Sequence, residues 1–133
     1  MEAVGIGMAS YILLTLVGLW FLTKRYTNLR PKVEELDLLA VHQWIEDEAE
    51  LWDVRSEREW DTGVLEGCRL VEYGDIPSGL NPDKKVVCFC TSGIRAREMA
   101  EKLKKGGVKT TAFFQGGFHH LKEDSAFTVV VPS

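Results

Sequence analysis

Residues 86–96 decide the fold, and they read Val86-Val87-Cys88-Phe89-Cys90-Thr91-Ser92-Gly93-Ile94-Arg95-Ala96. An apolar run such as 86–89 is typical of a buried strand. Small or turn-forming residues follow Cys90, and apolar side chains then recur at helical spacing from Ile94 to Lys105. We therefore expect a strand, a tight loop that starts at Cys90, and a helix.

A second strand is expected at 109–114, after a helix stop at Gly106-Gly107. A strand, a helix and a strand at this spacing form a βαβ unit, whose two strands lie parallel. Further elements are predicted outward from this unit: strands at 50–54 and 68–72, a brief edge strand at Leu36, a helix capped by Asp37, and a short helix at 118–122. The sequence thus predicts an α/β domain with a parallel sheet flanked by helices.

The N-terminal segment 3–23 carries no charged side chain. As a helix it would span about 30 Å, which matches the hydrocarbon core of a bilayer. The basic residues Lys24, Arg25, Arg30 and Lys32 follow it, so the positive-inside rule places the N-terminus outside and the remaining chain in the cytoplasm. A cleaved signal peptide or a buried core helix is the alternative reading.

These patterns divide the chain into four parts. We expect a transmembrane anchor at 1–25, a linker at 26–32, a globular domain at 33–122 and a C-terminal tail at 123–133. Residues 127–131 fit either a last strand or an extended arm, and both possibilities stay open.

Bulk composition excludes several classes of protein. The net charge of −4 gives no indication of nucleic-acid binding. The three cysteines, Cys68, Cys88 and Cys90, form no disulfide framework and fit a reducing compartment. Neither His42 nor the pair His119-His120 has a second ligand at a suitable spacing, so we expect no metal and no other cofactor.

The loop after Cys90 indicates thiol chemistry. A strand that ends under a helix N-terminus directs unpaired N–H groups to one point, and Ser92 and Gly93 let the backbone curl around an anion. Arg95 adds a positive charge, so the site favours a thiolate and stabilises negative charge during attack. The structural alternative is a buried cysteine before an ordinary turn, and Cys88 fits that description.

Three blocks of sequence resemble the rhodanese (sulfurtransferase) family, here in a single-domain form with an N-terminal membrane anchor. They are Leu51-Trp52-Asp53-Val54-Arg55 followed by Glu59-Trp60 and Gly63-Val64-Leu65-Glu66-Gly67, then Cys90-Thr91-Ser92-Gly93-Ile94-Arg95-Ala96, and last Gln115-Gly116-Gly117-Phe118. The resemblance covers most of residues 33–122. It departs from the family at Val64, Cys68 and Leu121, where histidine, alanine and tryptophan are common.

The resemblance implies a reaction and assigns residues to it. Cys90 would take the outer sulfur of an anionic donor such as thiosulfate, or of a persulfide, and pass it to cyanide or a thiol, including a protein thiol. The loop Thr91, Ser92, Gly93, Ile94 and Arg95 would hold the persulfide and the anion, with Arg95 closing the loop. By the resemblance, Asp53 and Arg55 would support the loop from behind. Without the resemblance, the types and spacing of these residues favour a structural network of Asp53, Arg55 and Glu59.

Two other functions compete with this one. Cysteine phosphatases and arsenate reductases use a similar loop, but theirs is one residue longer between cysteine and arginine and usually follows a histidine, where this chain has Phe89. The shorter loop suits a sulfur atom better than a tetrahedral phosphate. A membrane-tethered sulfur carrier or binding module without catalytic activity is the second alternative.

Overall fold

The computed structural model describes residues 2–29 and 31–132, with side chains described for 7–25 and 31–132. It divides into two compact units, Met1–Pro31 and Lys32–Ser133. The first unit is one helix, α1 (Glu2–Leu29), which continues through most of the expected linker. Arg30, one of the expected basic flanking residues, lies outside the described residues.

Within α1, Gly7–Arg25 is long and apolar enough to cross a membrane, a property that signal sequences share. Its described apolar side chains are exposed, with Leu14 at 72% and Leu22 at 65%. By length and composition alone, such an apolar helix is typical of a segment that crosses a bilayer.

The second unit is built on a five-stranded parallel sheet with the order β1-β6-β5-β2-β4. Its strands are β1 (Glu34–Leu36), β2 (Glu50–Asp53), β4 (Arg69–Leu70), β5 (Lys85–Phe89) and β6 (Thr110–Phe114). The two central strands β5 and β6 are buried along most of their length, as their apolar sequences predict. β4 is shorter than the expected strand at 68–72.

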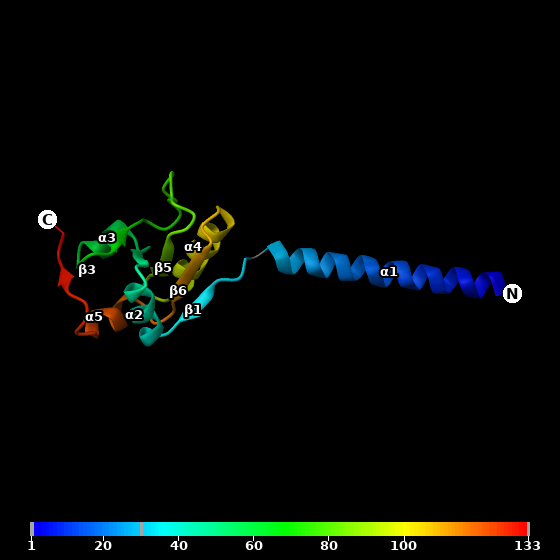
Figure 1. Cartoon of the computed structure of the whole chain (residues 1–133), viewed down its shortest axis with the longest axis horizontal. Helices are drawn as coiled ribbons and strands as arrows, with labels where there is room; N and C mark the ends of the chain where they lie inside the picture. Colours follow the sequence, from blue (N-terminus) through cyan, green and yellow to red (C-terminus); the bar gives the residue numbers. More distant parts are fainter. Residues whose placement is uncertain (1, 30, 133) are drawn as a thin grey trace. The chain divides into compact units, whose positions relative to one another are not determined.

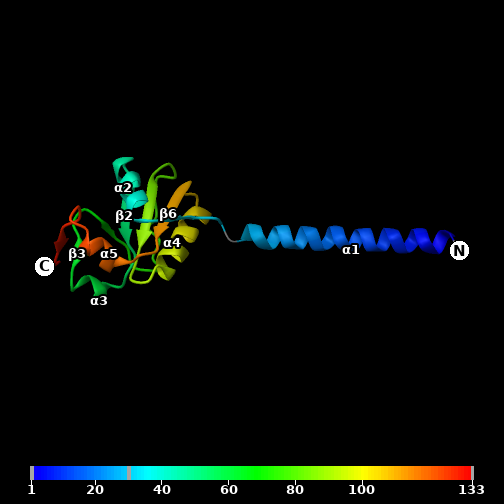
Figure 2. The same ribbon diagram turned by 90° about the horizontal axis from the view of Figure 1, so that it is seen from below.

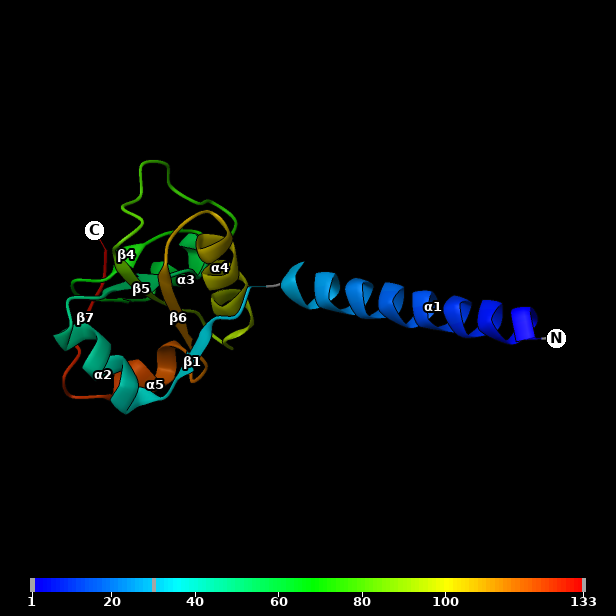
Figure 3. The same ribbon diagram turned by 45° about the vertical axis from the view of Figure 1, so that its right-hand side comes forward.

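Helices cover both faces of this sheet, as expected (Figures 1 and 3). On one face lies α4 (Ile94–Lys105), which buries Ala96, Met99, Ala100 and Leu103. On the other face lie α2 (Leu38–Glu46) and α5 (Phe118–Glu123). Asp37 caps α2 by accepting a hydrogen bond of 2.8 Å from the Ala40 N–H, which confirms the predicted start of that helix.

The C-terminal residues 127–131 contain a strand, which settles the question that the sequence left open. β7 (Val129–Val130) pairs antiparallel with β3 (Val64–Leu65), a strand that sequence patterns did not predict. The C-terminal residues therefore belong to the compact unit that begins at Lys32.

The sheet's polarity determines where the loops meet. Because the five strands are parallel, the segments after β2, β5 and β6 all leave from the same edge, and Figure 2 shows α3 (Glu57–Trp60) and α5 near that end. Ligands in open α/β sheets bind at this edge.

Candidate active site

Cys90 directly follows β5 at the carboxyl edge of the sheet, and its side chain is completely buried. The Gly93 N–H donates a hydrogen bond of 3.0 Å to the Cys90 Sγ. Gly93 is also the N-cap of α4, so the thiol lies under the first turn of that helix. A backbone donor and a helix N-terminus both favour negative charge on this sulfur.

The other two thiols lie in different surroundings. Burial raises the pKa of Cys88 far above its usual range, because this side chain is enclosed in the core. Burial, together with the nearby Asp53 carboxylate, raises the pKa of Cys68 to about 11. Both groups are therefore protonated at neutral pH and are weak nucleophiles.

The loop between Cys90 and α4 requires glycine at position 93. Gly93 has φ = 89°, in the left-handed region, and a Cβ there would lie 3.0 Å from the Gln115 carbonyl oxygen. Thr91, Ser92 and Ile94 are exposed around it, with Ile94 at 66%. The N–H groups of Thr91 and Ser92 have no acceptor among the described residues, so they are free to bind a substrate anion.

The turn Gln115-Gly116-Gly117 packs directly on this loop. The Phe118 N–H donates to the Cys90 carbonyl at 2.8 Å, and a Cβ on Gly117 would lie 2.1 Å from the Thr91 carbonyl oxygen. The expected closing turn and the expected loop thus form a single unit at the end of the sheet.

Arg95 is held in an ion pair rather than left as a free charge. Its guanidinium donates to both carboxylate oxygens of Glu59, at 2.7 and 3.2 Å, and to the Thr91 hydroxyl at 3.3 Å. The Thr91 hydroxyl itself donates to Glu59 at 2.5 Å. The full positive charge expected beside Cys90 is therefore largely balanced by Glu59.

The sequence placed Glu59 in a structural network with Asp53 and Arg55, and Arg55 does donate to the Glu59 backbone carbonyl at 3.5 Å. The pairing of the Glu59 carboxylate with Arg95 was not predicted. Arg95 is the main cause that holds the pKa of this carboxyl far below its usual range, and hydrogen bonds from Thr91 and Ser56 lower it further. Glu59 in turn raises the pKa of Arg95, and Cys90 adds a smaller contribution in the same direction. Ser56-x-x-Glu59 is a capping box, a recognisable signal for α3 that does not indicate a partner as distant as Arg95.

Asp53 and Arg55 form a buried pair, 0% and 3% exposed, behind the loop. The Arg55 Nη2 donates to the Asp53 Oδ2 at 2.8 Å and to the Gly63 carbonyl at 2.8 Å. Its guanidinium also lies 3.7 Å from the centre of the Phe118 ring. These contacts join the end of β2 to the start of α5, and none of them reaches Cys90.

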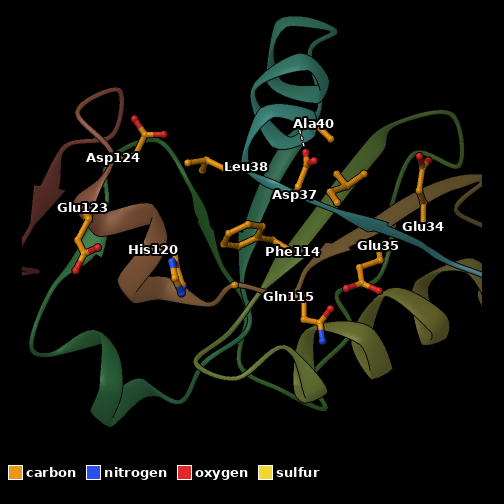
Figure 4. A pocket seen from close by; sticks show the side chains of 12 residues that line it. Glu34, Glu35, Asp37, Leu38, Ala40, Phe114, Gln115, His120, Glu123 and Asp124 are labelled. Atoms are coloured by element: carbon orange, nitrogen blue, oxygen red, sulfur yellow. Dashed lines mark hydrogen bonds between the residues drawn. The ribbon is translucent and has the colours of Figure 1, made fainter.

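A groove of about 1000 Å³ lies behind the same closing turn (Figure 4). Gln115 and Gly116 line it, whereas Cys90 and the loop residues 91–95 do not. Its other lining residues include the carboxylates of Glu34, Glu35, Asp37, Glu123 and Asp124. Carboxylates that gather in one groove disfavour the binding of an anion there.

The family model of the rhodanese-like domain matches residues 37–124, which contain four of the five strands of the parallel sheet, the Cys90 loop and the closing turn. This chain belongs to the rhodanese-like domain family.

Relatives of this rhodanese-like domain carry sulfurtransferase names. The chain is 35% identical over 72 residues to a probable adenylyltransferase/sulfurtransferase, MoeZ, of Mycobacterium tuberculosis, and this match covers 50% of the chain but 18% of MoeZ. It is 32% identical over 84 residues to the putative sulfurtransferase YtwF of Bacillus subtilis, covering 59% of the chain and 82% of YtwF. The family and these names together support sulfurtransferase activity in general.

The fold is similar to that of a rhodanese-like domain protein from Staphylococcus aureus. The TM-score is 0.63 at 19% identity, and the match covers 76% of this chain and 100% of the other. This likeness agrees with the sequence prediction of a rhodanese-like parallel sheet flanked by helices.

Proposed function

We propose that this protein transfers sulfane sulfur through a persulfide on Cys90. The observation that carries the proposal is the position of the Cys90 Sγ, at the carboxyl end of β5 and 3.0 Å from the Gly93 N–H. A thiolate formed there is stabilised before reaction, and the same donors then face the charge of a bound persulfide.

The reaction balances without an oxidant or a cofactor. The Cys90 thiolate attacks the outer sulfur of thiosulfate, the S–S bond of the donor breaks, and sulfite leaves with the electron pair. A thiolate or cyanide then attacks the terminal sulfur of the Cys90 persulfide, and that S–S bond breaks. The acceptor leaves with the sulfur atom, and Cys90 is again a thiolate.

The loop supplies the binding groups for this reaction. The N–H groups of Thr91 and Ser92, two exposed residues, bind the donor anion. Glu59 holds Arg95 so that Arg95 closes the loop. Because Cys90 is completely covered, the loop shifts to admit a donor, and the exposed Ile94 lies on the segment that has to move. Asp53 and Arg55 hold the end of β2 in place during this shift.

We also propose that residues 3–23 anchor the protein in a membrane by a single pass, with the catalytic domain on the cytoplasmic side. The supporting features are the apolar span Gly7–Arg25 and the basic residues at and after its C-terminal end. The acceptor is then a thiol that reaches the domain from the cytoplasm, including a protein thiol.

Sulfur transfer from thiosulfate to cyanide tests the proposal, with wild type and Cys90→Ser compared on the full chain. We expect turnover in wild type and its loss in Cys90→Ser. Cys68→Ala is the matched control, because it removes a thiol outside the loop, and it should keep the activity. Turnover that survives Cys90→Ser contradicts the mechanism.

The same experiment separates the alternatives. A protein that accepts one sulfur atom on Cys90 but does not turn over thiosulfate is a carrier rather than an enzyme. Hydrolysis of an aryl phosphate that depends on Cys90 would instead indicate a phosphatase. The loop is short for that reaction, so we expect no phosphate release.

A further inference from the structure

A small pocket lies at the opposite end of the sheet from Cys90, beside the first residues of β1 and β6. Its volume is about 340 Å³. It is lined by Lys32, Val33, Glu34, Trp44, Lys104, Lys109, Thr110 and Thr111. The three lysines come from the start of β1, the end of α4 and the start of β6, so the fold brings them together from distant parts of the sequence.

The charges in this pocket are unbalanced. Three of its lining residues are lysines, and Glu34 is the one acidic residue among them. The Lys104 Nζ donates to the Lys32 carbonyl at 2.5 Å, which holds these two residues side by side. Lys109 lies 3.0 Å from Asp83, but both side chains are more than 70% exposed, so solvent screens their pairing. The site therefore attracts an anion.

Thr111 provides a second and independent observation. It lines the pocket, it is only 4% exposed, and its hydroxyl has no hydrogen-bond partner among the residues that the structure describes. A buried hydroxyl without a partner is costly, and a ligand oxygen would remove that cost.

The place of the pocket in the chain indicates the source of the anion. Lys32 follows Arg25, the end of the apolar span, by seven residues, which extend over at most about 25 Å. Basic groups this near a membrane segment meet the negative surface of anionic lipids.

We propose that this pocket binds a phosphate group, carried by an anionic lipid headgroup or by a soluble phosphate. The proposal adds a ligand site to the sulfur-transfer function and does not depend on Cys90 chemistry. With a lipid headgroup in the pocket, the amino ends of the strands face the membrane surface. Cys90, at the carboxyl ends, then faces away from the bilayer toward its substrates.

The test uses the full chain in phosphatidylcholine nanodiscs, with increasing mole fractions of phosphatidylglycerol or, separately, with inorganic phosphate. Hydrogen exchange is followed in peptides that cover 31–36 and 102–111. We expect exchange to slow as phosphatidylglycerol increases. Each lysine removed should raise the mole fraction at half-maximal protection about fivefold, so the double variant K104Q/K109Q should raise it about 25-fold.

Two single variants sharpen the test. Lys105 lies at the same end of α4 but does not line the pocket. Lys105→Gln should therefore keep the protection from hydrogen exchange that wild type shows. Thr111→Val keeps the shape of the side chain and removes the hydroxyl, so it should weaken binding without lowering thermal stability.

Each outcome decides the question. If only phosphatidylglycerol slows hydrogen exchange, the ligand is a lipid headgroup. If inorganic phosphate slows it, the ligand is a soluble phosphate. Protection by neither overturns the proposal. The proposal is also overturned if Lys105→Gln loses as much protection from hydrogen exchange as K104Q/K109Q does. Diffuse surface charge, rather than the pocket, would then be responsible for binding. Persulfide formation on Cys90 is measured separately and is expected in every variant.

Discussion

At the scale of single residues, the site depends on how Glu59 and Arg95 are paired. Glu59 accepts hydrogen bonds from Arg95 and Thr91 on the loop and from Ser56 at the start of α3. One carboxylate thus connects the loop that carries the thiol to a neighbouring helix. The loop is held in place by an ion pair that is about 30% exposed on each side.

Glu59→Gln tests this connection. The substitution removes the charge that holds Arg95, and we expect it to lower the free energy of unfolding by about 1–2 kcal/mol at pH 7. Thermal unfolding measures the loss. Glu57→Gln, an exposed neighbour on the same short helix, is the control and should change stability little.

The pH dependence of this effect has a definite sign. The pKa of Glu59 in the folded protein lies below its ordinary value of 4.5, with the Arg95 guanidinium as the main cause. The stabilisation is therefore fully present above pH 4.5 and is lost as the pH falls toward the folded pKa. Unfolding curves of wild type and Glu59→Gln should converge in acid. A difference that stays constant would show that the ion pair is not its origin.

The buried pair of Asp53 and Arg55 makes a stronger prediction. Asp53→Ala leaves the Arg55 guanidinium buried without its carboxylate, so we expect a loss of about 3–5 kcal/mol in the free energy of unfolding. Chemical denaturation measures it. Asp61→Ala, at an exposed position after α3, should stay close to wild type.

At the scale of elements, the active-site loop depends on the turn that packs against it. Gly117 and Gly107 both have φ in the left-handed region, at 80° and 112°. A Cβ on Gly117 meets the Thr91 carbonyl, whereas a Cβ on Gly107 meets nothing within 4 Å. A substitution at either glycine therefore strains the backbone, but only a substitution at Gly117 also displaces the loop.

We expect Gly117→Ala to abolish sulfur transfer and Gly107→Ala to keep it. Both variants carry the backbone cost of about 1–3 kcal/mol, but only the first displaces the loop. Thiosulfate-dependent turnover, measured on protein that circular dichroism shows to be folded, distinguishes them. Equal activity in the two variants would mean that the turn does not position the loop.

Elements with strong local signals were predictable from the sequence. The apolar run before Cys90, the Asp37 cap and the apolar positions of α4 each specify their element through neighbours in the chain. The strands β3 and β7 are different. Each has two residues, and the pairing of Val64 with Val130 depends on a contact between distant segments that local patterns do not encode.

The same division holds for the site: the parts with local sequence signals were predictable, and the long-range contacts were not. Cys90, Gly93 and the closing turn follow from their order in the chain, and the structure brings them together. The pairing of Glu59 with Arg95 is long-range, and sequence periodicity contains no information about it. The lysine pocket is missed for the same reason, since Lys32, Lys104 and Lys109 meet only in the folded domain.

At the scale of the whole molecule, the chain joins an apolar helix to a rhodanese-like domain. We expect the full chain to sediment with membranes and to resist extraction by high salt, and a chain that begins at Pro31 to be released. In intact cells, an external protease should leave the domain uncut if it lies on the cytoplasmic side. Cleavage from outside would reverse the proposed orientation.

The central claim is that Cys90 carries the sulfur in transit, and intact-mass analysis tests it most directly. After exposure to thiosulfate, without an acceptor, wild type should gain one sulfur atom, which peptide mapping should locate on Cys90. Cys90→Ser should gain none, and addition of cyanide should restore the original mass of wild type. Sulfur on Cys68 or Cys88, or a gain that persists in Cys90→Ser, would contradict the mechanism.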